Sequence, residues 1–298
     1  MSKVTIYQEA CNQVKGFQEM GETFMRRLVI DGRSKSTHEN YLRQFAKLAL
    51  HYKQLPLRLD TADLEEYLYF LIQNDTASQS SFKHLIYGLR KLFLLFDQEE
   101  LHVCLPKISR SKKLPVVLSH PEIKRLLLAP CNMRERVMFG FVYDTGLRIS
   151  ELTNLLIGDV DLDRKRVHVR ESKYKKDRYV TLSDMAASGL TKHLTLNRPK
   201  LYLFEHASRK GIPICKTQVR RFLKEAIEKA NIRKNVCVHT LRHTYATHQL
   251  EAGQNIVSLK EALGHTHIET TLVYLHVAKI NPAGQFGCLE KLYGKPCS

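Results

Sequence analysis

The sequence predicts a mainly α-helical protein with one small β-sheet, in which an N-terminal helical bundle precedes an α+β domain. Three observations lead to this prediction. Apolar residues recur at helical spacing along most of the chain, alternating segments at 167–169 and 179–182 indicate short strands, and a basic segment with two prolines separates the two parts. With 298 residues, of which 43% are hydrophobic and 26% charged, the chain is long enough for two domains with buried cores.

Helices account for the first hundred residues. Four stretches each place apolar side chains on one face of a helix, which predicts a small bundle. Polar residues that favour helix starts precede three of them, and Ser36 and Glu39 have the spacing of a capping box. The four apolar stripes run from Met20 to Leu28, Tyr41 to Tyr52, Leu64 to Leu71 and Phe82 to Phe96.

Beyond residue 118 the pattern mixes helices with short strands. Ser119 and Glu122 again have capping-box spacing, and Gly146 lies in a turn that precedes a further helical stripe. The two strands flank a charged tip, which predicts a hairpin. Further helices are predicted near 216–231, 240–252, 255–263 and 267–275, the last after capping-box spacing at Thr266 and Glu269.

The predicted boundaries are residues 1–100 for the bundle, 101–118 for a basic linker and 119–298 for the second domain. Charge divides the chain in the same way, because residues 1–100 carry 13 basic and 13 acidic side chains whereas residues 101–298 carry 34 and 17. The whole net charge of +17 therefore lies beyond residue 100. Such an excess points to a polyanionic partner such as nucleic acid, with a generic solvated surface as the alternative.

Bulk features exclude several other classes of protein. Seven cysteines without a CxxC pair argue against a disulfide framework and against a thiolate zinc site. The longest apolar run, Val137 to Tyr143, has seven residues, far short of the ~18 that a membrane helix requires. The first residues lack the pattern of a signal peptide. We therefore expect a cytoplasmic, nucleoid-associated protein.

Five polar side chains lie at predicted helix ends or on one helix face: Arg148, His239, Arg242, His265 and Tyr274. A set of this kind suits chemistry at a phosphodiester, because arginines neutralise the nonbridging oxygens as charge builds on phosphorus. A tyrosine hydroxyl can attack the phosphorus and conserve the bond energy in a phosphotyrosine ester. Each residue alone has a structural alternative, which is an ion pair for an arginine, a helix start for a histidine and the core for a tyrosine.

A metal site is the competing interpretation of the histidines. His239 and His243 are four residues apart on a predicted helix, but the H-E-x-x-H pattern requires a glutamate where Thr240 stands. His265 and His267 would add ligands, yet no carboxylate lies at a spacing typical of such a site. We therefore expect neither a metal nor another cofactor.

Three segments carry a resemblance to a known family: DTGLRISEL (144–152), HTLRHTYATHQLEAG (239–253) and LGHTHIETTLVYLHV (263–277). In order and spacing they resemble the signature blocks of the tyrosine recombinases, the phage-integrase and Xer-like family. The resemblance implies that the bundle is a SAM-like core-binding domain and that the α+β domain is catalytic. It also implies an enzyme that cuts and rejoins DNA through a 3′-phosphotyrosyl intermediate.

The resemblance assigns roles by position. Arg148 and Arg242 would hold the scissile phosphate, and Tyr274 would attack it. His239 and His265 would assist proton transfer and phosphate binding.

The general acid toward the departing 5′ oxygen would be Lys173, at the tip of the predicted hairpin. Family members often have glycines beside this lysine, whereas this chain has Ser172 and Tyr174. Lys175 and Lys176 are close enough to remain alternatives.

The resemblance further implies that both domains clamp double-stranded DNA and that four protomers assemble on two duplexes. Glu151 matches an acidic position that helps to hold the active-site scaffold. The C-terminal segment, with apolar anchors from Phe286 to Tyr293, is expected to contact a neighbouring protomer, with packing on its own domain as the alternative. Candidate DNA contacts are Arg43, Lys47, Lys83, Arg90 and Lys91 in the bundle, and Lys175, Lys176, Arg178, Arg220 and Arg221 in the second domain.

The biological role stays open between related functions. The first is a site-specific recombinase or integrase of a mobile element, and the second is an Xer-type resolvase of chromosome or plasmid dimers. Accessory DNA-bending proteins or a second recombinase would be further partners. A type IB topoisomerase would use similar chemistry without pairing two sites. A non-catalytic DNA-binding regulator would be expected to lack the nucleophile or an arginine, and none is missing.

Overall fold

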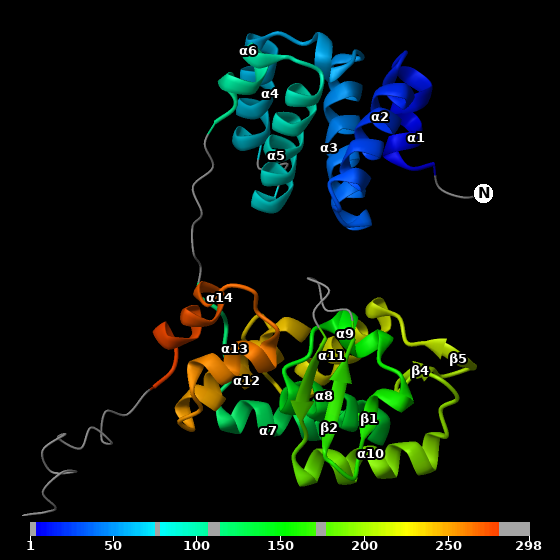
Figure 1. The fold of residues 1–298 in the computed structure, drawn as a ribbon, viewed down its shortest axis with the longest axis vertical. Helices are drawn as coiled ribbons and strands as arrows, with labels where there is room; N and C mark the ends of the chain where they lie inside the picture. The colour runs from blue at the N-terminus through cyan, green and yellow to red at the C-terminus, as the bar shows by residue number, and fades with distance from the viewer. Residues whose placement is uncertain (1–3, 75–77, 107–113, 171–176, 280–298) are drawn as a thin grey trace, which may run out of the picture. The chain divides into compact units, whose positions relative to one another are not determined.

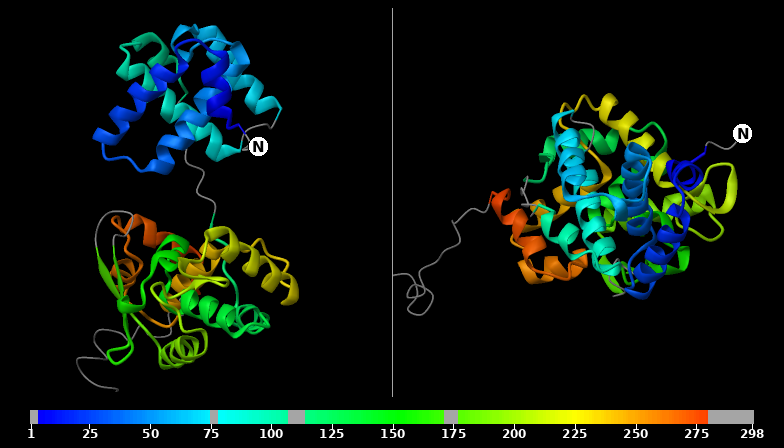
Figure 2. Two further views of the ribbon diagram at one scale, coloured as in Figure 1. Left: turned by 90° about the vertical axis from the view of Figure 1, so that its right-hand side faces the viewer. Right: turned by 90° about the horizontal axis from the view of Figure 1, so that it is seen from above.

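The computed structural model of the protein describes residues 4–74, 78–106, 114–170 and 177–279. The chain divides into two compact units, Met1–Ser111 and Lys112–Ser298, each of which is described by itself. Helices make up most of both units in every view (Figures 1 and 2), as the sequence predicts. Within the described residues, no helix combines the length and apolar character needed to cross a membrane.

The N-terminal unit is a helical bundle in which α3 packs against α1 and α5. Its fully buried phenyl rings come from Phe17, Phe24, Phe45 and Phe93, which belong to the predicted apolar stripes or lie beside them. Each such ring removed from water contributes about 1.5–3 kcal/mol. The elements are α1 (Ile6–Gln13), α2 (Phe17–Ile30), α3 (Lys35–Tyr52), the 3-10 helix η1 (Pro56–Arg58), α4 (Thr61–Gln73), α5 (Gln79–Leu95) and α6 (Glu99–Cys104).

Helix starts in this unit follow the predicted signals with one exception. Asp60 caps α4 by accepting the backbone N–H of Asp63 at 2.8 Å. The predicted capping box at Ser36 is wrong, because α3 begins at Lys35 and Ser34 precedes it. The Ser34 hydroxyl lies 3.1 Å from the Ser36 hydroxyl, so these hydroxyls bond to one another rather than to the backbone of the first turn.

The second unit combines helices with two small sheets around a core of its own. Helix α8 contacts both α10 and α12, and its Phe139 and Phe141 side chains are buried. The helices are α7 (His120–Leu128), α8 (Met133–Thr145), α9 (Ile149–Asn154), α10 (Asp184–Asn197), α11 (Lys216–Lys229), α12 (Val238–Glu251), α13 (Ile256–Leu263) and α14 (Glu269–Leu272), with 3-10 helices η2 (Ile157–Asp159) and η3 (Val273–His276). The strands are β1 (Val160–Asp161), β2 (Arg166–Val169), β3 (Arg178–Thr181), β4 (Glu205–His206) and β5 (Arg209–Pro213).

The predicted strand pair corresponds to β2 and β3 of the larger sheet, whose antiparallel order is β1-β2-β3. Val167 lies opposite Val180 on the buried face, and His168 lies opposite Tyr179 with ring centroids 4.8 Å apart. The β4–β5 hairpin was not predicted, because β5 is largely exposed and lacks alternating apolar residues.

Two glycines end helices in this unit, and one of them, Gly146, lies in the turn that the sequence predicts. Gly146 follows α8 with φ of 63°, and Gly264 follows α13 with φ of 62°. This left-handed conformation costs a residue with a Cβ atom about 1–2 kcal/mol. Both helix ends therefore turn sharply, and the polar residues discussed below follow these turns.

Replacing Gly146 with alanine is expected to destabilise the protein by about 2–4 kcal/mol, from backbone strain and overpacking together. A Cβ atom there would lie 2.5 Å from Tyr245 Cδ1 and 3.1 Å from Leu263 Cδ2. Gly253→Ala is the matched control, because φ is 88° at Gly253 but no atom lies within 4 Å of the added carbon. Urea unfolding measures both variants, and equal losses would show that crowding at Gly146 is unimportant.

The last predicted helix differs from the structure. Residues 267–275 were expected to form one helix with a capping box at Thr266 and Glu269. Instead a four-residue α14 begins after Ile268 without a side-chain cap and continues directly into η3. The break places Tyr274 in the 3-10 helix rather than in the second turn of an α-helix. The predicted C-terminal anchors from Phe286 to Tyr293 lie outside the described residues.

Candidate active site

Arg148 is positioned by the turn that joins α8 to α9. It is the N-cap residue of α9, and its backbone N–H donates to the Glu151 carboxylate at 2.9 Å. Its guanidinium donates to the same carboxylate at 2.8 Å and reaches the Gly264 carbonyl at 3.4 Å. Its side chain remains 19% exposed, so part of the guanidinium is available to a ligand.

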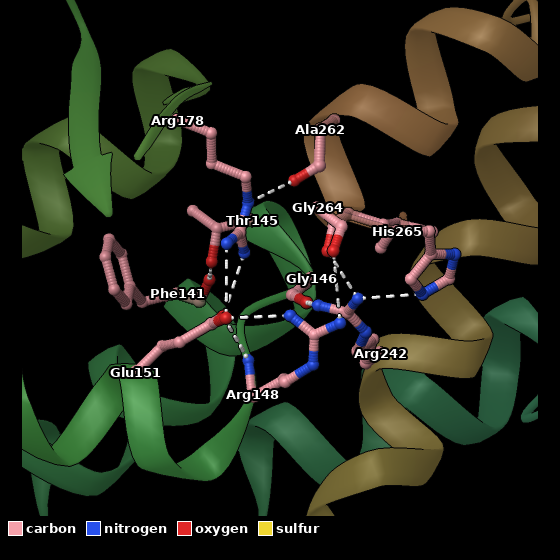
Figure 3. A network of polar contacts seen from close by, with 11 residues as sticks. Phe141, Thr145, Gly146, Arg148, Glu151, Arg178, Arg242, Ala262, Gly264 and His265 are labelled. Atoms are coloured by element: carbon pink, nitrogen blue, oxygen red, sulfur yellow. Dashed lines mark hydrogen bonds and ion pairs between the residues drawn. The ribbon is translucent and has the colours of Figure 1, made fainter. Parts of the chain in front are cut away.

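Glu151 connects two arginines from separate segments (Figure 3). Besides Arg148, it accepts two hydrogen bonds from Arg178 of β3, at 2.8 and 3.1 Å. Burial alone would raise the pKa of this carboxyl, but the hydrogen bonds and charge of Arg178, followed by those of Arg148, lower it to about 2. Glu151 is therefore a buried anion that fixes the orientation of both guanidinium groups.

Arg178 was predicted to contact DNA, but in the structure its guanidinium lies among partners within its own unit. Its side chain is 8% exposed, and its Nε atom donates to the Ala262 carbonyl at 2.8 Å. A guanidinium whose donors are satisfied by Glu151 and a helix end has little left for a phosphate. Arg178 instead ties β3 to the end of α13.

Protonation of Glu151 is expected to lower the stability of the protein as the pH falls. The folded-state pKa lies below the ordinary value of 4.5, so the contribution is complete above about pH 4.5 and is lost as the pH falls toward 2. Between about pH 6 and 3 this one carboxyl is worth about 2 kcal/mol. When the pH is lowered from about 6 to 3, the free energy of unfolding of the wild-type protein should fall by about 2 kcal/mol more than that of Glu151→Gln. Guanidinium titrations at the two pH values measure this difference. Glu261→Gln, which alters an exposed residue of α13, should behave like wild type.

Arg242 is fully buried in α12. It donates to the carbonyls of Gly146 and Leu263, at 2.6 Å each, and its Nη2 atom lies 3.0 Å from Nε2 of His265. Burial, followed by the charge of Arg148, lowers its pKa to about 10, so it stays charged at neutral pH. Its Nε atom is buried and has no hydrogen-bond partner in the structure.

His265 follows the Gly264 turn and is held in one tautomer. Because arginine only donates, Nε2 of His265 must accept from Arg242, and Nδ1 then carries the proton that points to the Thr271 hydroxyl at 2.9 Å. Burial, then Arg242 and Arg148, lowers the pKa of His265 to about 3. The imidazole is therefore neutral.

His239 occupies the first turn of α12 and keeps an exposed side. Burial of its inner side, together with the charges of Arg242 and Arg148, lowers its pKa. Its ring meets the ring of His243 edge-on, with centroids 4.4 Å apart.

Tyr274 is 3% exposed in η3, and its hydroxyl lies 3.0 Å from Nδ1 of His243. Burial raises its pKa, and the charges of Arg242 and Arg148 act in the opposite direction. From the sequence, His243 was considered only as a metal ligand, and its contact with Tyr274 was not predicted. Its position four residues after His239 was the available signal, since this spacing places both rings on one side of α12.

The described residues also contain one group with a metal-like arrangement, and it does not include the site histidines. His120, His248 and Glu251 have ligand atoms within 4.8 Å of one another. However, Nδ1 of His248 bonds to the Tyr143 hydroxyl at 2.8 Å. A Glu251 oxygen accepts the Lys279 backbone N–H at 2.9 Å.

Several candidate DNA contacts lie at the surface of their own unit. Arg43 and Lys47 are exposed on α3, four residues apart, and Lys83 is half-buried on α5. Arg220 and Arg221 are exposed on α11. These side chains are available to phosphates, and Lys173, Lys175 and Lys176 lie outside the described residues.

Two further candidates in the bundle have partners within it. Arg90 donates to the carbonyls of Leu105 and Pro106, at 3.1 and 2.7 Å. Lys91 forms an ion pair with Asp31 at 3.1 Å. The Asp31 carboxylate offsets the charge of Lys91. Arg90 stabilises the segment after α6 through its two carbonyl contacts.

Comparisons with known proteins agree with this arrangement. The model of the phage integrase family matches residues 116–280, and that of the phage integrase N-terminal SAM-like domain matches residues 21–102. The chain is 33% identical over 259 residues to a tyrosine recombinase of Thermosipho africanus, covering 82% of this chain and 90% of that protein. It is 32% identical over 288 residues to the tyrosine recombinase XerA of Thermococcus kodakarensis, covering 93% and 98%. A solved lambda integrase dimer bound to a COC′ core site shares the fold, with a TM-score of 0.70 and 17% identity over 90% of this chain and 78% of that one.

A helical SAM-like unit followed by an integrase catalytic unit defines a class of DNA strand-transfer enzymes. The chain belongs to the phage integrase family, the tyrosine recombinases. It is an enzyme that cleaves and rejoins DNA strands by transesterification. The family and the fold class inferred from the sequence are thereby confirmed.

Proposed function

We propose that the chain is a site-specific recombinase in which the Tyr274 hydroxyl attacks the scissile phosphorus. The attack forms a 3′-phosphotyrosyl ester and releases a 5′ oxygen, which takes a proton to become a hydroxyl. A free 5′-hydroxyl from a second strand then reverses the step. Each ester that breaks conserves the energy for the next, so the reaction needs neither a metal nor a nucleotide.

The observation that carries this proposal is the environment of Arg242. Its Nε atom is a buried donor without a partner, and a buried donor left unsatisfied costs about 1–3 kcal/mol. An incoming phosphate oxygen would satisfy it. Arg242 also contacts His265, and its charge acts on Tyr274, so the phosphate would lie beside the nucleophile. Arg148, partly exposed and oriented by Glu151, would bind the second nonbridging oxygen.

The proposed general acid is Lys173, with Lys175 and Lys176 as alternatives. All three belong to the segment between β2 and β3, strands whose pairing brings Val169 opposite Arg178. His265 is neutral and bonded to Arg242, so it would position phosphate oxygens. His239, exposed on one side at the start of α12, would do the same.

The partner that we propose is double-stranded DNA carrying specific recombination sites, bound by a tetramer on two duplexes. The exposed cations Arg43, Lys47, Arg220 and Arg221, together with the net charge of +17, support phosphate contacts by both units. The DNA in the lambda integrase structure supports the same partner for this chain. The C-terminal segment would contact a neighbouring protomer, and accessory proteins would act on the assembly.

The biological setting that we propose is movement of a mobile element, with resolution of chromosome or plasmid dimers as the second candidate. The likeness to a putative integrase/recombinase of Sinorhizobium fredii supports the first candidate, and the likeness to XerA supports the second. Assays on DNA flanking the gene separate them. Excision of a circle that contains the gene supports a mobile element, and resolution of a tandem repeat of one chromosomal site supports a resolvase.

A suicide substrate tests the chemistry. A nicked duplex that carries the site loses a short 5′ fragment after cleavage, so that the covalent complex accumulates. Digestion and mass spectrometry should find the nucleotide on the peptide containing Tyr274, linked through its 3′ phosphate. An adduct on another residue would assign the nucleophile elsewhere. If the protein binds flanking sites and forms no adduct on any of them, it acts as a DNA-binding regulator.

A further inference from the structure

The Tyr274 hydroxyl has a specific neighbour that the family motifs do not assign to it. Nδ1 of His243 lies 3.0 Å from the phenolic oxygen, and the two ring centroids are 5.5 Å apart. The contact joins α12 to η3, which pack against each other. It therefore depends on the tertiary packing of the catalytic unit rather than on a flexible surface side chain.

The other site imidazoles are engaged differently. Both ring nitrogens of His265 have partners, Arg242 and the Thr271 hydroxyl, and its ring stacks near Tyr274 with centroids 6.4 Å apart. His239 contacts the ring of His243 edge-on. Among the hydrogen bonds of the described side chains, that of His243 therefore brings an imidazole nitrogen to the Tyr274 hydroxyl, and in the tautomer with the proton on Nε2 this nitrogen accepts.

A tyrosine hydroxyl must lose its proton as it attacks phosphorus, and a buried tyrosine ionises less readily than an exposed one. We propose that His243 is the general base of strand cleavage, accepting the Tyr274 proton on Nδ1 as the new ester forms. This inference rests on the proposed function, because it takes Tyr274 to be the nucleophile. It adds a catalytic residue to the set that the family resemblance implies.

The step balances. The Tyr274 O–H bond breaks and its proton moves to Nδ1 of His243, while the phenolic oxygen bonds to phosphorus and the bond from phosphorus to the 5′ oxygen breaks. The departing oxygen takes a proton from the general acid on the other side of the phosphate. During rejoining, the protonated His243 returns its proton to the phenolic oxygen as the 5′-hydroxyl attacks.

The electrostatic surroundings keep His243 neutral and therefore able to accept a proton. The titratable and charged groups that act on it are His239, Arg242 and Tyr274, from α12 and η3. Burial, then His239 and Arg242, lowers its pKa to about 4 in the DNA-free protein, so it is neutral at physiological pH. A phosphate bound at Arg242 would offset part of that positive charge and make His243 more basic during the reaction.

The test compares single-turnover cleavage by wild type and His243→Asn on a substrate with a 5′-bridging sulfur. This leaving group needs no strong acid, so the general acid does not contribute to the pH profile. Asparagine places an oxygen where Nδ1 lies and can hold the hydroxyl, but it does not accept a proton. A base role predicts about a 10²-fold loss near pH 7. It also predicts a variant rate that rises about tenfold per pH unit up to about pH 9, because tyrosine must then ionise by itself, whereas the wild-type profile stays flat.

A positioning role alone would leave His243→Asn near the wild-type rate with a flat profile, and that result would overturn the proposal. A fluorinated, more acidic tyrosine at position 274 should shrink the loss, and an unchanged loss would also overturn it. If His243→Asn does not fold, His243→Gln replaces it in the same assay. The matched control is His248→Asn, which removes another part-buried tyrosine–histidine pair, between α8 and α12, and should cleave normally.

The same assay with Tyr274→Phe separates the two proposals. If that variant still forms a covalent complex, the assignment of the nucleophile fails. If it forms none while His243→Asn cleaves normally, only the general-base inference fails.

Discussion

Tyr274→Phe is expected to reduce strand cleavage by about 10⁴-fold or more, because the variant lacks the nucleophilic oxygen. The side chain is 3% exposed, and phenylalanine fills the same volume. Folding loses the hydrogen bond to His243, which is worth about 0.5–1.5 kcal/mol. DNA binding in a gel-shift assay should therefore persist while the covalent complex on the suicide substrate disappears.

Tyr143→Phe is the matched control for this prediction. The Tyr143 hydroxyl bonds to Nδ1 of His248 at 2.8 Å, much as Tyr274 bonds to His243. Its removal costs a similar contact outside the set of reacting residues, so cleavage should continue at the wild-type rate. Full activity of Tyr274→Phe, or equal losses in the two variants, would contradict the role of Tyr274.

Arg242→Lys is expected to lower cleavage by about 10³-fold with a much smaller effect on DNA affinity. A lysine keeps the charge but provides one ammonium group where the guanidinium supplies a planar fork. That fork already serves the carbonyls of Gly146 and Leu263 and the His265 ring, and its Nε–H and second Nη1–H would be the donors left for the phosphate. A single ammonium group cannot reach all of these acceptors.

The lost contacts also predict a change in stability. A carbonyl of Gly146 or Leu263 left without a donor costs about 1–3 kcal/mol, which urea unfolding detects. Arg134→Lys is the control, because Arg134 is a half-buried arginine that donates to the Glu205 carbonyl. It should show a stability loss without a specific loss of cleavage. Parallel losses of DNA binding and cleavage in Arg242→Lys would assign Arg242 a purely structural role.

Much of the fold was predictable because its signals are local. Ser119 caps α7 as its spacing with Glu122 indicates, and Gly146 and Gly264 end helices where a positive φ is required. The buried Val167 and Val180 alternate with less buried neighbours as a strand pair should. These features depend on a few adjacent residues and on the solvent, so distant parts of the chain do not alter them.

Where the structure differs from the sequence-based predictions, the cause is a tertiary contact. The spacing at Thr266 and Glu269 satisfies a capping rule, yet the helix there is short and continues as η3, whose Tyr274 ring is buried against α12. Arg178 has the charge of a DNA contact, but its partners Glu151 and Ala262 are 27 and 84 residues away. No local pattern predicts a partner at that distance.

The sequence by itself determined the family, the mainly helical architecture, the concentration of charge beyond residue 100 and the identity of five polar residues in the candidate site. These properties are written in composition, periodicity and motif spacing. The tertiary structure alone decided that Arg178 braces Glu151, that Arg242 is buried with one unpartnered nitrogen, and that His243 contacts Tyr274. Hydrogen bonding and burial depend on which segments pack together, and the packing of α12 against η3 and of β3 against α13 is a property of the folded chain.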